Sequence, residues 1–543
     1  MRCSALFIRF LLSLVLVWMS GSWIPAAGAT GLGPALLAPL AGDETDAKLE
    51  AIARLGTEPS PQAAVVLDAL ANDRLYVTPE AQFLVETSSG AVDAATGASV
   101  SVMPAQAETV SVNNRLRRAI AAALSAARLH APDPAQRLAA ARGLQRGADV
   151  AVLPTLEKAL ADEQNAEVKE ALAIAVAALH LKSDTAALRI QAAETLGNTG
   201  NAAFRPALQA VLQRDAQGVY AEPDTEVRAA ATTALHRIER HLSMLEWIGN
   251  LFYGVSLGSV LLLAALGLAI TFGLMGVINM AHGELLMIGA YVTYAVQALF
   301  RSWFPQWLDA YVIAAMPVAF VVTALVGMAL ERTVIRWLYG RPLETLLATW
   351  GISLMLMQAV RTLFGAQNVE VSNPSWMSGG VTVLGGLVLS YNRIAIIVFA
   401  ILVVAFVWAL LNHTRLGLFV RAITQNRRMA DCVGVPTGRV DMLAFGLGAG
   451  IAGLAGVALS QLGNVGPDLG RGYIVDSFMV VVLGGVGQLA GTVVAALGLG
   501  AVTKFLEPYS GAVMAKIVIL VLIVLFVQKR PQGLFAPRGR SAD

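Results

Sequence analysis

The chain has 543 residues, of which 56% are hydrophobic and only 14% are charged. Soluble domains usually carry about 25% charged residues. This composition excludes a disordered, collagen-like or coiled-coil chain, and it excludes an ordinary cytosolic enzyme unless the apolar excess is confined to one part.

The charges divide the chain into two parts. Residues 1–247 contain 21 Lys and Arg and 26 Asp and Glu, whereas residues 248–543 contain 18 and 11, so the net charge of +2 combines −5 in front with +7 behind. The rear part has about half the charge density of the front part. We therefore expect a domain in water followed by a domain in lipid.

The first 29 residues are typical of a secretory signal peptide. Two arginines precede the apolar stretch Leu11–Trp18, and Ala27-Gly-Ala29 forms a small-residue cleavage site. An uncleaved anchor helix is the alternative, although the apolar run is shorter than the roughly 20 residues that a span needs. Both alternatives place Thr30 outside the cytoplasm. Cleavage would leave only Cys432, so we expect no internal disulfide.

Residues 30–245 are predicted to form an exported helical domain. The segment is rich in Ala, Leu, Arg and Gln, which favour helix. Similar stretches begin at Arg137, Val168, Leu188 and Val227. This recurrence predicts HEAT-like helical pairs stacked in a periplasmic repeat domain, with a plain helical bundle as the alternative.

Residues 80–112 differ from the rest of this domain. They are rich in Ser, Thr, Val and Gly and lack helical periodicity, so a loop or a small strand pair is predicted. The scattered histidines of the domain have no metal-ligand spacing, and we expect a binding or docking surface and no metal site.

Residues 248–530 are predicted to form a polytopic membrane domain, which makes the predicted fold class all-α. Long charge-free runs, the first from Trp247 to Gly283, are typical of spans because a bilayer core needs about 20 apolar residues per helix. Nine spans are predicted, with eight as the alternative. They lie near residues 250–275, 280–300, 310–330, 344–364, 392–411, 441–462, 475–488, 491–506 and 512–528.

The basic residues predict the orientation of this domain. Twelve of its 18 Lys and Arg residues fall on one side of the nine-span arrangement, and the positive-inside rule makes that side cytoplasmic. The exported front domain requires the same entry, and residues 531–543 become a cytoplasmic tail. The twelve are Arg332, Arg336, Arg341, Arg415, Arg421, Arg427, Arg428, Arg439, Lys529, Arg530, Arg538 and Arg540.

Two glycine-rich stretches resemble nucleotide-binding motifs. Gly448-Ala-Gly-Ile-Ala-Gly453 fits a dinucleotide fingerprint but lies inside a charge-free span and not in a βαβ unit. We therefore expect a small-residue face for helix packing. Gly484–Gly491 lacks the Gly-Lys pair of a phosphate loop, and that dipeptide occurs nowhere in the sequence. The predicted packing residues are Gly446, Gly450, Gly453 and Gly456.

The stretch Gly276–Glu284 places Asn279, His282 and Glu284 between two long apolar runs. Polar groups at membrane depth need a partner, a cavity or the interface. One interpretation is an interrupted helix that lines a transport path. The other is a short cytoplasmic turn with interfacial residues.

The largest basic loop contains Arg421–Val435, which begins with helix formers and ends near a glycine. It is predicted to be either a positive-inside anchor or a short cytoplasmic helix that docks into another subunit. The candidate docking residues, which the resemblance described next would make ATPase-coupling residues, are Arg421, Gln425, Asn426, Met429, Ala430 and Gly434.

Four segments resemble bacterial branched-chain amino acid permeases, the LivH-type subunits of ATP-binding cassette importers. They are Gly273–Tyr291, Arg421–Val435, Val475–Gln488 and Arg530–Phe535. The resemblance covers about residues 248–540. It gives no role to the front domain, which ordinary members of the family lack.

Within this family the chain most resembles the urea permeases of UrtB type. The similarity lies in Met280 of the signature, in Leu347–Ile352 and in Val371–Gly380, and such permeases also carry a long exported extension. The resemblance implies a heteromeric importer in the inner membrane, with membrane lipid around it and no nucleic acid. Its other subunits would be a second, LivM-type permease, two cytoplasmic ATPases that hold ATP and Mg, and a periplasmic substrate-binding protein.

We therefore expect a urea permease subunit that does no covalent chemistry, binds no cofactor itself and has no ATPase motif. Import of a branched-chain amino acid or a short amide is the alternative within the transporters. A membrane sensor whose helical domain binds a periplasmic ligand, and an intramembrane enzyme, are the alternatives from other classes. The candidate path residues are Asn279, His282, Glu284, Thr349 and Ser477.

Overall fold

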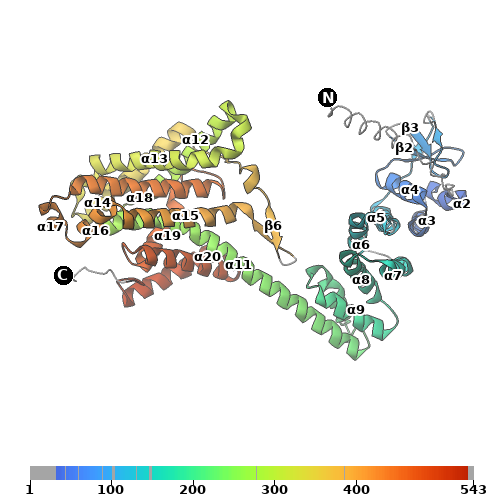
Figure 1. Cartoon of the computed structure of the whole chain (residues 1–543). Coiled ribbons are helices and arrows are strands. Elements are labelled where there is room, and N and C mark those ends of the chain that lie inside the picture. Colours follow the sequence, from blue (N-terminus) through green and yellow to red (C-terminus); the bar gives the residue numbers. More distant parts are fainter. Residues whose placement is uncertain are drawn as a thin grey trace, which may run out of the picture. The chain divides into compact units, whose positions relative to one another are not determined.

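The computed structural model describes residues 32–535, except residues 43, 59, 88–89, 101–103, 105, 130, 146–149, 277 and 384–385. The predicted signal peptide and residues 536–543 of the predicted tail therefore lie outside the described residues. The chain is mostly helical, as predicted (Figure 1). It divides into two compact units between Leu242 and Ser243.

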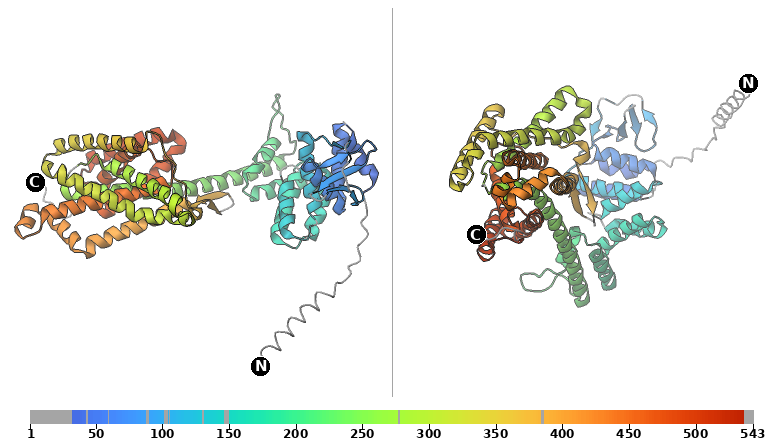
Figure 2. Two further views of the ribbon diagram at one scale, coloured as in Figure 1. Left: turned by 90° about the horizontal axis from the view of Figure 1, so that it is seen from above. Right: turned by 60° about the vertical axis from the view of Figure 1, so that its left-hand side comes forward.

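The front unit begins with a helical and a β part that share one core. Leu55, Leu67, Phe83, Val85 and Ile120 are buried together between helices α3–α5 and the sheet, whose strands appear in blue in Figure 2. The elements are α2 (Pro34–Leu37), η1 (Ala38–Ala41), α3 (Thr45–Thr57), α4 (Pro61–Ala71), β1 (Leu75–Val77), β2 (Phe83–Thr87), β3 (Gly90–Asp93), β4 (Ser99–Val100), β5 (Glu108–Thr109) and α5 (Asn114–Arg128).

The β part corrects the prediction of a loop or strand pair and the all-α class in this region. Its five antiparallel strands have the order β4-β3-β2-β1-β5, and Leu75 pairs with Val85 in the central register. The strands are two to five residues long. Segments this short contain too few alternations to show a strand period in the sequence.

A recurring arginine anchors the helices of the remaining front unit. Arg137, Arg189 and Arg228 are each the fourth residue of a helix, and each guanidinium donates to the two carbonyls five and six residues earlier, at 2.7–2.9 Å. The helices and 3₁₀ turns are α6 (Pro134–Leu144), η2 (Val150–Val152), α7 (Leu153–Asp162), α8 (Ala166–His180), α9 (Ala186–Asn198), η3 (Ala202–Phe204), α10 (Arg205–Val211) and α11 (Thr225–Met275).

The anchoring arginines also bind acids further along the chain. Arg137 donates to Glu163 at 2.7 and 3.0 Å, and Arg189 donates to Glu222 at 2.9 Å. Both carboxylates are nearly buried, so each pair ties one loop to the next. This recurrence is compatible with stacked helical pairs, and the HEAT-like assignment stays a prediction.

The second unit consists mainly of long apolar helices. Among the described residues, seven helices are long and apolar enough to cross a membrane. After α11 the elements are α12 (His282–Trp303), η4 (Pro305–Ala310), α13 (Tyr311–Thr333), η5 (Ile335–Leu338), α14 (Pro342–Phe364), η6 (Ser375–Met377), β6 (Gly380–Val383), β7 (Leu387–Ser390), α15 (Tyr391–His413), α16 (Arg415–Gln425), α17 (Arg427–Cys432), α18 (Thr437–Ser460), α19 (Leu469–Gly484) and α20 (Leu489–Lys529).

The last three predicted spans correspond to two elements. The span near 475–488 falls in α19, which has only 16 residues. The spans near 491–506 and 512–528 are the two halves of α20, which is interrupted at Gly511 with a φ of 76°. Eight or nine crossings therefore stay a prediction.

Helices α11, α12 and α18 form the centre of this unit. In the most apolar 18-residue stretch of each helix, 78% of the stretch is buried in α11 and 83% in α18, compared with 17% in α20. Figures 1 and 2 show α12, α13 and α18 side by side. The more exposed helices, α14, α15 and α20, leave apolar side chains on the surface, as expected where lipid or another subunit is the neighbour.

The α18 glycines lie where neighbouring helices approach closely. A Cβ built at Gly446 would lie 2.6 Å from the Met328 side chain, and one at Gly450 would lie 2.6 Å from the Phe320 ring. The space beside Gly453 is taken by Thr323, and that beside Gly456 by the α12 backbone at Leu286. Side chains at these positions would therefore push α18 away from α12 and α13.

Candidate functional site

The segment between α11 and α12 folds back into the helix bundle. Helix α11 ends at Met275, yet Nε2 of His282, the first residue of α12, lies 2.9 Å from the carbonyl oxygen of Ala264. Ala264 precedes the end of α11 by 11 residues, or about 16 Å along a helix. Helix α12 therefore begins among the other helices and not at their end.

Three of the candidate path residues are buried in this interruption between α11 and α12, which we call the break. Asn279, His282 and Glu284 are 2%, 0% and 3% exposed, which agrees with the interrupted-helix interpretation and not with an interfacial turn. Among the described residues, Asn279 Nδ2, His282 Nδ1 and Glu284 Oε2 are buried atoms without a hydrogen-bond partner. Unsatisfied buried polar groups are costly, so each of these atoms marks a place where a ligand could supply the missing partner.

The hydrogen bonds define what each of these side chains can offer. His282 Nε2 faces a carbonyl, which only accepts, so Nε2 carries the proton and Nδ1 of the neutral ring is an acceptor. Asn279 Oδ1 accepts from the Ala281 amide at 3.0 Å, which leaves its NH₂ group as a donor. The break thus offers the Asn279 NH₂ group as a donor and His282 Nδ1 as an acceptor, whereas Glu284 Oε2 accepts only when its carboxyl group is ionised.

Thr349 fixes the position of the break. Its hydroxyl accepts a hydrogen bond from the Met280 amide at 3.2 Å and donates to the Thr345 carbonyl at 2.8 Å. Because Thr349 lies on α14, this contact ties the irregular segment to a helix some seventy residues later in the chain. Thr349 therefore positions the segment, and its single O–H donor is already engaged within α14.

Four further polar residues extend this site along α12 and α14 to Asp468 at the start of α19. Ser353, one turn beyond Thr349, is buried and lies near the Glu284 carboxyl group. Two turns further, Arg361 pairs with Asp468 at 3.1 Å, and both the Tyr291 hydroxyl and Arg361 Nε are buried without a partner among the described residues. We call Asn279, His282, Glu284, Tyr291, Ser353, Arg361 and Asp468 the polar file.

The sequence contained only part of the signal for the polar file. Thr345, Thr349 and Ser353 recur at intervals of four residues and so form one polar stripe on a helix, which could have revealed Ser353. The pair of Arg361 and Asp468 joins residues 107 positions apart, and such a pairing follows only from the tertiary arrangement.

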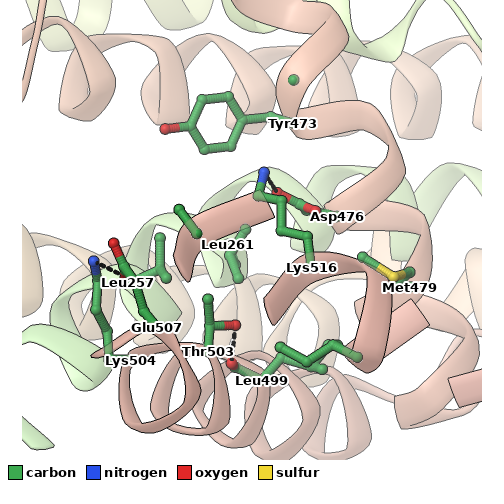
Figure 3. Close-up of a pocket in the computed structure, with 13 residues that line it drawn as sticks. Leu257, Leu261, Tyr473, Asp476, Met479, Leu499, Thr503, Lys504, Glu507 and Lys516 are labelled. Carbon is green, nitrogen blue, oxygen red and sulfur yellow. Dashed lines mark hydrogen bonds and ion pairs between the residues drawn. The ribbon is translucent and has the colours of Figure 1, made fainter. Parts of the chain in front are cut away.

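Ser477 is not brought to this file. It is buried, and its hydroxyl donates to the Tyr473 carbonyl within α19 at 2.7 Å. Among the described residues, no hydrogen bond links Ser477 to another candidate path residue. Its neighbour Asp476 instead lines a cavity of about 300 Å³ between α11, α19 and α20, with Tyr473, Lys504, Glu507 and Lys516 around it (Figure 3).

The predicted coupling segment forms the two short helices α16 and α17. Three of its candidate residues hold these helices in place. The Arg421 guanidinium donates to the Leu411 carbonyl at the end of α15 at 2.9 Å, the Asn426 side chain caps α17 through the Met429 amide at 3.0 Å, and Ala430 is buried.

The other candidate coupling residues are exposed. Gln425, Met429 and Gly434 lie at the surface, and Gly434 adopts a φ of 88° that favours glycine. The apolar side chains of Leu418 on α16 and of Val433, which follows α17, are also exposed, and these two were not among the predicted residues. Exposed apolar side chains on a basic segment are suited to contact with another protein.

The sequence is similar to a known family over the second unit. Residues 250–527 match the family described as "Branched-chain amino acid transport system / permease component". The permease protein BraD of Pseudomonas aeruginosa, from a high-affinity branched-chain amino acid transport system, is 30% identical over 294 residues, which are 53% of this chain and 95% of BraD. LivH of Salmonella typhimurium is 29% identical over 297 residues, covering 53% and 96%.

A shorter similarity extends to sugar transport, and solved structures add nothing. The ribose import permease RbsC of Escherichia coli is 30% identical over 134 residues, which are 23% of this chain and 42% of RbsC. No solved structure matches. The family match spans just over half of this chain and includes the break, α14 and the predicted coupling segment. The chain therefore belongs to the family of permease components of branched-chain amino acid transport systems.

Proposed function

We propose that this chain is the inner-membrane permease subunit of an ATP-binding cassette importer and that its substrate is urea. ATP would be hydrolysed on two cytoplasmic ATPase subunits that dock on α16 and α17. A second, LivM-type permease and a periplasmic binding protein would complete the importer. The front unit would lie in the periplasm and the end of the chain in the cytoplasm.

The observation that carries the substrate proposal is the set of three unpartnered atoms at the α12 start. Urea has one carbonyl, which accepts, and two NH₂ groups, which donate. Asn279 Nδ2 is a donor, His282 Nδ1 is an acceptor, and Glu284 Oε2 is an acceptor when its carboxyl group is ionised. These groups are complementary in kind to the carbonyl and NH₂ groups of urea, and a buried polar site rejects ligands that leave its groups unpaired.

Uptake of radiolabelled urea and leucine in a strain that lacks the transporter genes tests this proposal. The strain is complemented with the full importer carrying Asn279→Leu, or Thr362→Val on the exposed face of α14 as the control. We expect urea uptake to be abolished by the first variant and retained by the second. Leucine uptake without urea uptake in the unmodified importer would refute the urea proposal.

An aliphatic amino acid is the second candidate substrate. It agrees with the names of BraD and LivH, and it would need a cation for its carboxylate. Arg361 lies in the polar file, and Arg471 is close enough to Glu284 to interact with it electrostatically. The same uptake experiment separates the candidates, because Arg361→Gln should reduce transport of a zwitterion more than transport of neutral urea.

For the front unit we propose an exported, HEAT-like docking domain. The repeated arginine anchors at Arg137, Arg189 and Arg228 support this assignment. A ligand-sensing role is the alternative from a different class. Deletion of residues 32–224 distinguishes them, since loss of uptake favours docking of the binding protein, and intact uptake without regulation favours sensing.

A further inference from the structure

A network of charged and aromatic groups connects α17 to the core of the second unit. Arg427 of α17 forms an ion pair with both carboxylate oxygens of Asp441 in α18. The same guanidinium lies 5.0 Å from the centre of the Tyr339 ring, which follows η5. Asp441 is fully buried, and a buried carboxylate needs such a partner to remain charged.

The network continues from Tyr339 to the end of α11. The Tyr339 hydroxyl donates to Glu331 Oε1 at 2.9 Å and also lies 3.2 Å from the sulfur of Met275. Burial, followed by the nearby Asp441 and Glu331 carboxylates, raises the pKa of Tyr339 far above its ordinary value. Its hydroxyl therefore stays protonated at physiological pH and remains a donor.

An apolar contact runs beside this network. Ala430 of α17 is buried in one cluster with Leu274 of α11 and with Val435 and Val440. Leu274 and Met275 are the last residues of α11, and Gly276, which follows with a φ of 65°, begins the segment that carries Asn279. Helix α17 is thus joined through two kinds of contact to the residues directly before the break.

We propose that Arg427, Asp441, Tyr339 and Glu331 form a linkage that transmits displacement of α16 and α17 to the segment 276–281. This linkage rests on the proposed function, in which an ATPase subunit moves these helices. Arg427 and Tyr339 act as positioning residues: they hold Met275, and Met275 sets where the polar segment starts. Among the described residues, Arg428 makes no such contact, although it is the next residue on α17.

Hydrogen exchange of the full chain in lipid nanodiscs tests the linkage without any substrate or ATPase. Tyr339→Phe removes the hydroxyl contacts but keeps the ring beneath Arg427. Because it also leaves the buried Glu331 without its donor, the thermal unfolding midpoint is measured beside the exchange to confirm that the variant is folded. We expect amide exchange in residues 274–284 to rise by about 5- to 150-fold, as for a coupling of ordinary strength. Arg428→Gln is the matched control and should leave this exchange unchanged. Equal exchange in Tyr339→Phe and Arg428→Gln would overturn the linkage.

A second pair of variants addresses the charge. Arg427→Gln should raise exchange in the same residues, and the exchanged pair Arg427→Asp with Asp441→Arg should restore part of the protection. A fold defect would instead raise exchange throughout α18, including residues 446–456. In the assembled importer, Tyr339→Phe should lower transport per ATP hydrolysed while ATP hydrolysis continues; an unchanged ratio would refute the transmission, whatever the substrate.

Discussion

Replacement of Thr349 by valine isolates the contact that holds the break in place. Valine has nearly the same shape as threonine but cannot accept the hydrogen bond from the Met280 amide, which is 3.2 Å long. Met280 is partly buried, so the amide would be left incompletely satisfied at a cost of about 1–2 kcal/mol. An energy of this size changes an opening equilibrium by a factor of about 5–30.

The expected result is faster amide exchange in residues 278–284, by that factor, with little change in the midpoint of thermal unfolding. Local opening of one segment costs less free energy than global unfolding. Amide exchange in this segment can therefore change while the unfolding midpoint does not. Thr362→Val is the matched control, because Thr362 lies on the same helix and its hydroxyl donates to the Gln358 carbonyl at 2.9 Å in the same way. If both variants exchange alike, Thr349 does not position the break.

Three further predictions concern packing, acid stability and orientation. Gly456→Ala should destabilise the detergent-solubilised chain by about 1–3 kcal/mol, because a Cβ at this position would meet the α12 backbone. The control, Gly351→Ala, should not lower the thermal stability, because nothing lies within 4 Å of a Cβ at Gly351. Hydrogen bonds from Arg137 lower the pKa of Glu163 from 4.5 to about 2. The stabilisation by this carboxylate is therefore complete above pH 4.5 and is lost as the pH falls toward 2. In a separately produced segment 32–242, Glu163→Gln should remove this part of the acid dependence of unfolding, which circular dichroism measures. The third prediction uses Cys432, which is exposed on α17. In a Cys3→Ala background, a membrane-impermeant maleimide should label Cys432 in inside-out vesicles and not in intact spheroplasts. The opposite result would reverse the predicted orientation.

The long helices could be predicted from the sequence because a long run without charged residues is stable in lipid and rare in water-soluble domains. The depth of the break within the helix bundle could not be predicted. A cytoplasmic turn and a segment folded back among helices have the same composition, and only the contact of His282 with Ala264 distinguishes them. The polar residues were therefore found as a motif, whereas their burial required the tertiary structure.

The predicted coupling residues illustrate a second limit. Arg421 is exposed, and its guanidinium binds a carbonyl at the C-terminal end of α15, while its predicted contact with another subunit stays a prediction. Helix ends leave unpaired carbonyls that attract cations, and the sequence does not reveal which basic residue reaches them. The small sheet was missed for a related reason, since β4 and β5 have only two residues each and β5 pairs with β1, more than 30 residues earlier.

The close approach of glycines restricts which parts of the second unit can move. Gly289 lies against Gly453, Gly267 against Gly448, and Gly456 against the Leu286 carbonyl, so α11, α12 and α18 touch main chain to main chain. Such contacts contain no layer of side chains that could switch rotamers and let one helix slide past another. These three helices are therefore expected to move as one rigid body, and sliding is more easily accommodated at α14, which contributes the side chains of Ser353 and Arg361 to the polar file and has nothing within 4 Å of a Cβ at Gly351.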